Sequence, residues 1–397
     1  MMSRGWRQAL RCAALLRAGF LGAGLLIAGF LSGCGDFWQA PSSTTTTTPT
    51  GSSSGVFYVL NQQTAQIAAY SIVSGTLTPV SGSPYTLPGS AEPLAIAIAP
   101  NGAFLYVSTP LDGIFLYTIG SGGALTLGNS SSAISADLAT SMRVDATNQW
   151  LVEAGPDQAM LNAIAISSST GLATSKTEQT VLLPAATIHQ LTISPDNTHI
   201  FVALGGSGTE EAIFAAGNAN PFGNTANIPV VNAAGAALSV AVDPQNRLVY
   251  VGETAATSGT NSGGLRVFNY NTLAEVMGSP YASAGLAPYS ILPEAKGNYV
   301  YVANRTVSGS SSGNIAGFSF TSTGTVYSLT ALANPVVTGV TPVSLAEESL
   351  DTYLLVVDSG GSPDLEAYTM SSGALTSAIT SATGTDPVQP GAIASAP

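Results

Sequence analysis

Three side chains have types suited to ester hydrolysis: His189, Glu253 and Arg305. A histidine titrates near neutral pH, so it can act as a general base or a general acid. A carboxylate can orient that histidine or share in proton transfer. An arginine can hold a substrate carboxylate or stabilise a developing oxyanion. The three residues are far apart in the sequence, so they predict a site only if the fold brings them together.

The elements that must position these residues belong to a repeat of about 50 residues. A well-formed unit has an alternating apolar strand at 94–99, a Pro-Asn-Gly turn at 100–102 and a second strand at 103–108. Glycine adopts positive φ at little cost, which suits a tight hairpin. A second hairpin, with an aromatic residue and a Ser/Gly turn, follows each first hairpin. Four short strands per unit predict the blades of a β-propeller.

Counting the strands predicts the architecture. The first kind of strand occurs seven times, and so does the second. The repeats begin on a second strand at residue 56 and end on a first strand at 390–397. We therefore predict an all-β, seven-bladed propeller of four-stranded antiparallel blades, whose ring is closed by residues 390–397 beside 56–61. Such closure leaves no exposed sheet edge at the seam.

Repeat register assigns the three candidate residues to one mouth of the ring. In a blade the first strand lines the channel and the second runs antiparallel to it, so the start of one and the end of the other share a face. His189 opens the first strand of the fourth unit, Glu253 ends the second strand of the fifth, and Arg305 follows the second strand of the sixth. Each also has a structural alternative: a hydrogen-bonded histidine at a strand start, a solvated loop carboxylate and an arginine paired with a nearby acid.

The repeats resemble those of the seven-bladed lactonase family, which includes propeller-type 6-phosphogluconolactonases and muconate-lactonising enzymes, and those of YVTN-repeat propellers. The phrases at 105–108, 250–253 and 301–305 carry this resemblance, which spans about residues 56–397.

The resemblance implies a His-Glu-Arg active site for lactone hydrolysis, and His189 and Arg305 match the family pattern. The family glutamate follows an asparagine, one position later than Glu253, where this chain has Thr254. A one-residue slip reverses the face that a strand side chain occupies.

The N-terminus predicts export. A basic segment precedes an apolar run at 18–30, which is too short to span a bilayer as a helix. The run ends in Leu31-Ser32-Gly33-Cys34, which resembles the lipobox of bacterial lipoproteins; an ordinary signal peptide with a chance cysteine is the alternative. We predict a signal peptide at 1–33, a lipidated Cys34 with a Ser/Thr-rich tether at 34–55, and a propeller at 56–397, anchored in a bacterial cell envelope on the periplasmic side or the cell surface.

Charge is scarce: 8% of residues are charged and the net charge is −12. Four of the ten cations and none of the 22 acids lie in residues 1–33, so the remaining chain keeps six cations and a net charge of −16. Nucleic-acid binding is disfavoured, because phosphate contacts need clustered Lys and Arg. Of the six cations, Arg143 is predicted to pair with Asp145, which shares its strand face. The propeller has no cysteine, and neither a cofactor nor a metal site is predicted.

Two functions remain open from the sequence. The first is an exported, lipid-anchored hydrolase of a lactone or related cyclic ester that uses His189, Glu253 and Arg305. The second is a non-catalytic binding or scaffold propeller that holds an envelope protein or glycan. In both cases we expect a monomer attached to the membrane through its lipid anchor.

Overall fold

The computed structural model describes residues 53–90, 92–156, 159–381 and 386–397. The predicted signal peptide, Cys34 and most of the tether lie outside these ranges. No helix in the described ranges is long and apolar enough to cross a membrane.

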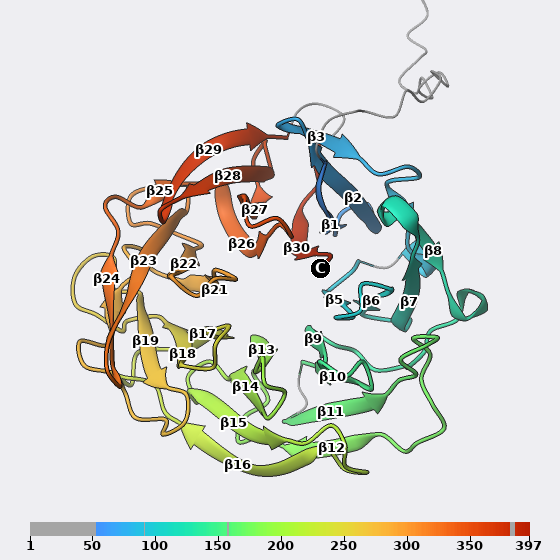
Figure 1. Cartoon of the computed structure of the whole chain (residues 1–397), viewed down its shortest axis with the longest axis horizontal. Coiled ribbons are helices and arrows are strands. Elements are labelled where there is room, and N and C mark those ends of the chain that lie inside the picture. The colour runs from blue at the N-terminus through green and yellow to red at the C-terminus, as the bar shows by residue number, and fades with distance from the viewer. Residues whose placement is uncertain (1–52, 91, 157–158, 382–385) are drawn as a thin grey trace, which may run out of the picture. The chain divides into compact units, whose positions relative to one another are not determined.

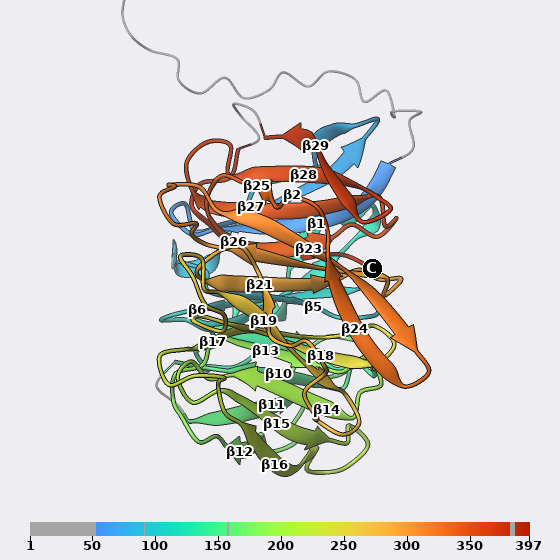
Figure 2. The same cartoon turned by 90° about the vertical axis from the view of Figure 1, so that its left-hand side faces the viewer.

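Seven antiparallel sheets surround a central axis, each with one edge at the centre (Figure 1). The predicted seven-bladed propeller is confirmed. Five sheets have four strands; blades 1 and 6 each add a short fifth, β4 (Tyr85–Thr86) and β25 (Val336–Val337). Viewed from the side, inner strands such as β21 (Pro288–Pro293) run from one face of the ring to the other (Figure 2).

The blades are named here in chain order, with the strands of each given from the centre outwards. Blade 1 consists of β30 (Pro390–Ser395), β1 (Ser53–Asn61), β2 (Gln66–Val73) and β3 (Thr76–Pro79). Blade 2 consists of β5 (Ala95–Ile98), β6 (Phe104–Thr109), β7 (Gly113–Ile119) and β8 (Leu125–Leu127). Blade 3 consists of β9 (Ser141–Val144), β10 (Trp150–Ala154), β11 (Met160–Ala165) and β12 (Gln179–Leu182). Blades 4 and 5 are β13 (Gln190–Ile193), β14 (His199–Ala203), β15 (Thr209–Phe214) and β16 (Phe222–Ile228); and β17 (Ala237–Val242), β18 (Leu248–Glu253), β19 (Gly264–Asn269) and β20 (Tyr281–Ala282). Blades 6 and 7 are β21 (Pro288–Pro293), β22 (Tyr299–Asn304), β23 (Asn314–Thr323) and β24 (Val326–Ala331); and β26 (Val340–Glu347), β27 (Tyr353–Gly360), β28 (Leu365–Ser371) and β29 (Ala374–Thr380).

The seam lies in blade 1, where the two ends of the repeat region meet. Strand β30 pairs antiparallel with β1, with Phe57 opposite Ser395 and Val59 opposite Ile393. The predicted closure of the ring by the C-terminal strand is therefore confirmed. Pairing β30 with β1 satisfies an edge that would otherwise expose unpaired backbone groups.

The apolar core lies between blades. In the described part of the chain the buried apolar side chains form seven clusters, and each cluster joins two adjacent blades. Successive residues of one strand serve different clusters: Phe57 packs towards blade 7 and Tyr58 towards blade 2. This follows from the alternation of side chains across a strand. Because both faces are covered, second strands such as β6 and β18 are buried along their whole length.

A polar ring joins neighbouring blades close to the axis. The residues Ser141, Gln190, Ser239 and Ser290 occupy similar positions in four successive first strands, each opposite the last or next-to-last residue of its second strand. The Oγ atoms of Ser141 and Ser290 accept hydrogen bonds from the next blade, at 3.0 and 3.1 Å from the backbone nitrogens of Leu191 and Leu345. Gln190 accepts one from Val240, and Ser239 donates one to the carbonyl of Pro288. The first strands are thus held in fixed relative positions around the channel.

Buried acids close the turns between first and second strands, at the opposite ends of the first strands. Asp145 accepts hydrogen bonds from the backbone N–H groups of Thr147, Gln149 and Trp150. Asp243 and Glu348 bind the equivalent turns of blades 5 and 7 in the same way. These three acids therefore stabilise turn geometry.

Candidate active site

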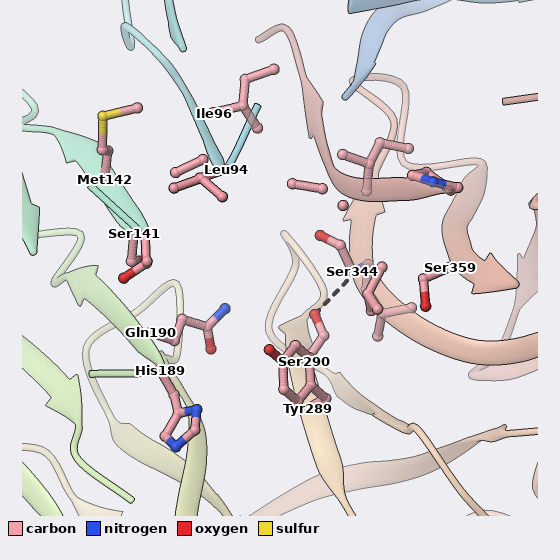
Figure 3. A pocket seen from close by; sticks show the side chains of 18 of the residues that line it. Leu94, Ile96, Ser141, Met142, His189, Gln190, Tyr289, Ser290, Ser344 and Ser359 are labelled. Carbon is pink, nitrogen blue, oxygen red and sulfur yellow. Dashed lines mark hydrogen bonds between the residues drawn. The ribbon is translucent and has the colours of Figure 1, made fainter. Parts of the chain in front are cut away.

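The central channel opens into a cavity of about 500 Å³. This volume is in the range of ligand-binding pockets. First-strand residues of six blades line it, and Figure 3 shows Gln190 pointing into the cavity opposite Tyr289 and Ser290. The polar ring around the axis therefore also contributes to the cavity wall.

His189 lies at the cavity wall, immediately before β13. Its backbone N–H donates to the carbonyl of Ala203 at 3.0 Å, which continues the ladder between β13 and β14. The ring lies beside Gly205, where an added Cβ would be 3.3 Å from Nε2. Gly205 also has a φ of 59°, so both its backbone conformation and the close ring favour glycine.

The environment of His189 favours the neutral imidazole. Burial lowers its pKa from the ordinary 6.5, because the cavity wall stabilises the charged form less well than water does. No side chain in the described ranges hydrogen-bonds either ring nitrogen. A neutral imidazole with an available nitrogen can accept a proton from water.

Arg305 lies at the same cavity, one residue after β22. Its guanidinium carbon is 4.3 Å from the centre of the Tyr289 ring, and this stacking holds the side chain without a counter-ion. Within the described residues it forms no ion pair. His189 and Arg305 are therefore brought to one cavity, as the repeat register predicts.

Arg143 is a second cation at this cavity, and the sequence analysis missed it. The carboxylate of Asp145 accepts hydrogen bonds from the backbone of its own turn, so the predicted Arg143–Asp145 pair is wrong. Arg143 instead donates to the carbonyl of Met142 at 2.8 Å, and it lines the cavity. Burial lowers its pKa, but arginine remains protonated in proteins. Its position on a first strand, which lines the channel, was the available signal.

The cavity is cationic in an acidic protein. Its lining includes two arginines and a histidine but no Asp or Glu. Elsewhere Arg247, Arg266 and Lys296 each pair with at least one carboxylate. The arginines without a carboxylate partner are therefore gathered where a ligand can reach them. Such a site attracts carboxylates and phosphates, which arginine can bind through two parallel hydrogen bonds.

Glu253 does not line this cavity. Its carboxylate is 2% exposed and accepts a hydrogen bond from the backbone nitrogen of Val231 at 3.0 Å. The other oxygen lies 3.5 Å from Nη1 of Arg266. Burial raises the pKa of Glu253, while Val231 and Arg266 act in the opposite direction. Glu253 fixes the segment that enters blade 5 and does not contact the His189 cavity.

Repeat register explains this placement. Asn304, the equivalent residue of blade 6, is also buried, and it bonds Ser283 in the segment that enters its blade. The next register position lines the cavity, where blade 6 has Arg305 and blade 7 has Ser359. In blade 5 that position is Thr254, whose hydroxyl accepts from the backbone of Ala236. A single residue along the strand therefore separates a packing position from a cavity position.

Replacing Glu253 by glutamine should reduce stability but leave activity nearly unchanged. The side-chain amide can still accept from Val231, but one of the two carboxylate charges that pair with Arg266 is lost, at a cost of about 1–3 kcal/mol. Thermal unfolding and kcat/KM for a hydrolysed lactone measure the two effects. If kcat/KM fell about 100-fold in a folded Glu253→Gln protein, Glu253 would belong to the catalytic set.

Comparison with known proteins gives the same fold. Residues 49–190 match the family model described as lactonase, 7-bladed β-propeller. The chain is a seven-bladed β-propeller that is similar to this family over the matched residues. No curated protein matches it significantly.

Solved structures match this propeller over nearly their whole length. One is from Bacteroides uniformis, described as a candidate 6-phosphogluconolactonase; it is 18% identical, with a TM-score of 0.66 over 86% of this chain and 99% of the other. Another is the periplasmic gluconolactonase PpgL of Pseudomonas aeruginosa, 15% identical, with a TM-score of 0.65 over 87% and 99%. At these identities the likeness establishes the shared fold.

Proposed function

We propose that this propeller hydrolyses an anionic lactone, or a related cyclic ester, in the central cavity. The observation that carries the proposal is the meeting of His189 with Arg143 and Arg305 in a cavity without acidic side chains. The family match at 49–190, which includes His189, supports lactone chemistry.

The proposed reaction adds water across the ring ester. Neutral His189 accepts a proton from water as its oxygen attacks the carbonyl carbon. One arginine stabilises the oxyanion that forms, and the other holds the anionic group of the substrate. The bond from the carbonyl carbon to the ring oxygen then breaks, and that oxygen takes the proton from the imidazolium. The product is an open-chain hydroxy acid.

We also propose that the enzyme is exported and lipid-anchored through Cys34. The support is the sequence alone: the basic segment, the apolar run at 18–30 and the Leu-Ser-Gly-Cys ending.

The test is hydrolysis of two lactones that share one ring and differ by a phosphate or carboxylate. We expect the purified chain to prefer the charged one by about 10–100-fold in kcat/KM, the value of one or two charged hydrogen bonds. Arg143→Gln and Arg305→Gln should each lower kcat/KM for the charged lactone. Only the variant that removes the oxyanion-stabilising arginine should also lower kcat/KM for the neutral lactone.

Lys296→Gln is the matched control. It removes the same charge from an exposed side chain that pairs with Asp351, away from the cavity lining. If the wild-type chain hydrolysed no member of a lactone panel above background, the hydrolase proposal would be rejected. If Lys296→Gln lowered the preference as much as Arg305→Gln, net charge rather than the cavity would explain it.

A non-catalytic propeller that holds an envelope protein or glycan is the second candidate. Two Ser/Gly-rich loops, at 258–263 and 308–313, support it, since both follow second strands and therefore lie at the His189 end of their blades. They contact each other, because the backbone of Ser308 donates to Asn261 at 2.9 Å. Loops on one face of a rigid scaffold are a common place for binding. Ligand binding that depends on Arg305, without turnover, would favour this candidate.

A further inference from the structure

A group of three carboxylates lies outside the central cavity, in blade 3. Asp137, Glu153 and Glu178 each offer one oxygen, and these oxygens lie within 4.8 Å of one another. Asp137 belongs to the segment that enters blade 3, Glu153 lies on the second strand β10, and Glu178 immediately precedes the outer strand β12. They come from three different parts of one blade.

Glu153 is buried without full hydrogen bonding. It is 1% exposed, and its Oε2 has no partner among the described residues. Its Oε1 accepts from the side-chain amide of Asn162, which lies opposite it on β11. A buried carboxylate oxygen without a partner is costly and needs an explanation, such as an ion.

Asn162 adds an independent sign of an absent ligand. Its Oδ1 is also buried without a partner in the described part of the chain, and the residue is 4% exposed. Because its amide already touches Glu153, a half-turn of the amide would present Oδ1 to an ion held by that carboxylate. An amide oxygen is an ordinary calcium ligand.

No cation neutralises the cluster. None of the ion pairs formed by the described residues includes Asp137, Glu153 or Glu178. Lys176, two residues before Glu178, has its amine 5.5 Å from the centre of the Trp150 ring. Burial, with smaller contributions from Asp137 and Glu178, raises the pKa of Glu153 to about 8, although the hydrogen bond from Asn162 acts in the opposite direction. Three carboxylates this close need protons or a cation between them.

We propose that Asp137, Glu153 and Glu178 form a calcium site, with the side-chain oxygen of Asn162 as a fourth ligand. The set contains only hard oxygen donors, which suit calcium or magnesium rather than zinc or copper. Calcium accepts six to eight oxygens at about 2.3–2.6 Å, so oxygens separated by up to 4.8 Å can share one ion. Magnesium demands a stricter octahedron and usually keeps several waters, so a set made only of side-chain oxygens favours calcium.

The ion would join the entry segment, the second strand and the outer edge of blade 3. Glu153 lies opposite Met142 of β9, which precedes Arg143. The site would therefore support the strand that carries a cavity arginine. The sequence analysis predicted no metal site, because residues 137, 153 and 178 form no known ligand spacing.

The test is calcium titration of the full chain after chelator treatment, followed by calorimetry and by thermal unfolding. We expect one calcium per chain, with a Kd of roughly 10⁻⁵–10⁻³ M, and a rise in Tm of several degrees at saturation. The half-buried variant Glu178→Gln should bind calcium at least tenfold more weakly. Without calcium its Tm should match or exceed that of the wild type, because one repelling charge is gone.

Glu210→Gln is the matched control. Glu210 is also a buried glutamate with an unpartnered oxygen, but it lies on β15 of blade 4, outside the cluster. Its replacement should leave calcium binding unchanged. The proposal would be overturned if the wild type bound no calcium up to about 10 mM, if Glu178→Gln bound as tightly as the wild type, or if magnesium bound more tightly. Equal stabilisation by Glu178→Gln with and without calcium would show that the carboxylates share protons instead. None of these readouts depends on lactone hydrolysis.

Discussion

Replacement of His189 by alanine is expected to lower kcat/KM for the hydrolysed lactone by about 10²–10⁴-fold, the usual contribution of a general base. The cavity lining contains no carboxylate that could take over the proton. Arg143 and Arg305 would remain, so the variant should still bind the anionic substrate. Initial rates over a range of substrate concentrations separate the loss in kcat from any change in KM.

The pH dependence of the wild-type enzyme tests the same assignment. Burial lowers the pKa of His189 from 6.5, so the neutral, active form persists to lower pH than for a solvated histidine. The acid limb of kcat/KM should therefore fall below pH 6.5, and it should disappear in His189→Ala. An acid limb above 6.5 that survives the substitution would assign the base to another group.

His199 is the matched control, because the chain has only two histidines. His199 lies at the turn end of blade 4, where Nδ1 is 2.6 Å from the hydroxyl of Tyr270 and Nε2 is 3.6 Å from Glu211. His199→Gln should reduce stability while the folded protein keeps its kcat/KM. Equal losses of activity in both histidine variants would contradict a catalytic role specific to His189.

Deletion of residues 390–397 is expected to abolish cooperative folding of the propeller. The deletion removes β30, which exposes the inner edge of β1 and takes Ile393 from the cluster between blades 1 and 7. It also removes the part of the cavity wall formed by residues 390–393. Circular dichroism during thermal unfolding should show a broad transition, or a Tm lowered by more than about 10 °C.

A point variant and a peptide make this result specific. Ile393→Asp places a charge at a side chain that is 6% exposed and should cost at least about 3 kcal/mol, whereas Ile393→Val should cost about 1 kcal/mol. A synthetic peptide of residues 386–397 should restore a sharp transition to the deleted chain by pairing with β1. A deleted chain that unfolds like the wild type would show that the seam carries little stability.

Repeat logic explains how much of this structure could be predicted. The alternating strands and the tight turns between them are local features, and the count of the strands predicted both the seven blades and the closure of β30 on β1. Register also brought His189 and Arg305 to one cavity. The predictions for Cys34, the signal peptide and export depend on residues outside the described ranges and remain predictions.

Register was not sufficient for side chains whose partners come from elsewhere in the fold. Glu253 of blade 5 and Arg305 of blade 6 lie at the same face of the ring. Glu253 is one strand position earlier than Arg305, so its side chain contacts Val231 and Arg266 instead of the cavity. Arg143 was assigned to Asp145 because alternate residues share a strand face, but the turn uses the aspartate. In both cases the competing partner is a backbone group or side chain that strand alternation does not specify.

The scarcity of charge was visible in the sequence: six cations and 22 acids after residue 33. The sequence alone also determined the propeller, because each unit repeats the same strands and turns. Only the tertiary structure decided how the charges are used. Buried acids such as Asp145 and Asp243 accept hydrogen bonds from backbone N–H groups of their turns. Arg143 and Arg305 therefore line the central cavity without a carboxylate partner. The physical reason is that a buried charge must be compensated by whichever group the packed fold brings near it, and that group is rarely its neighbour in the chain.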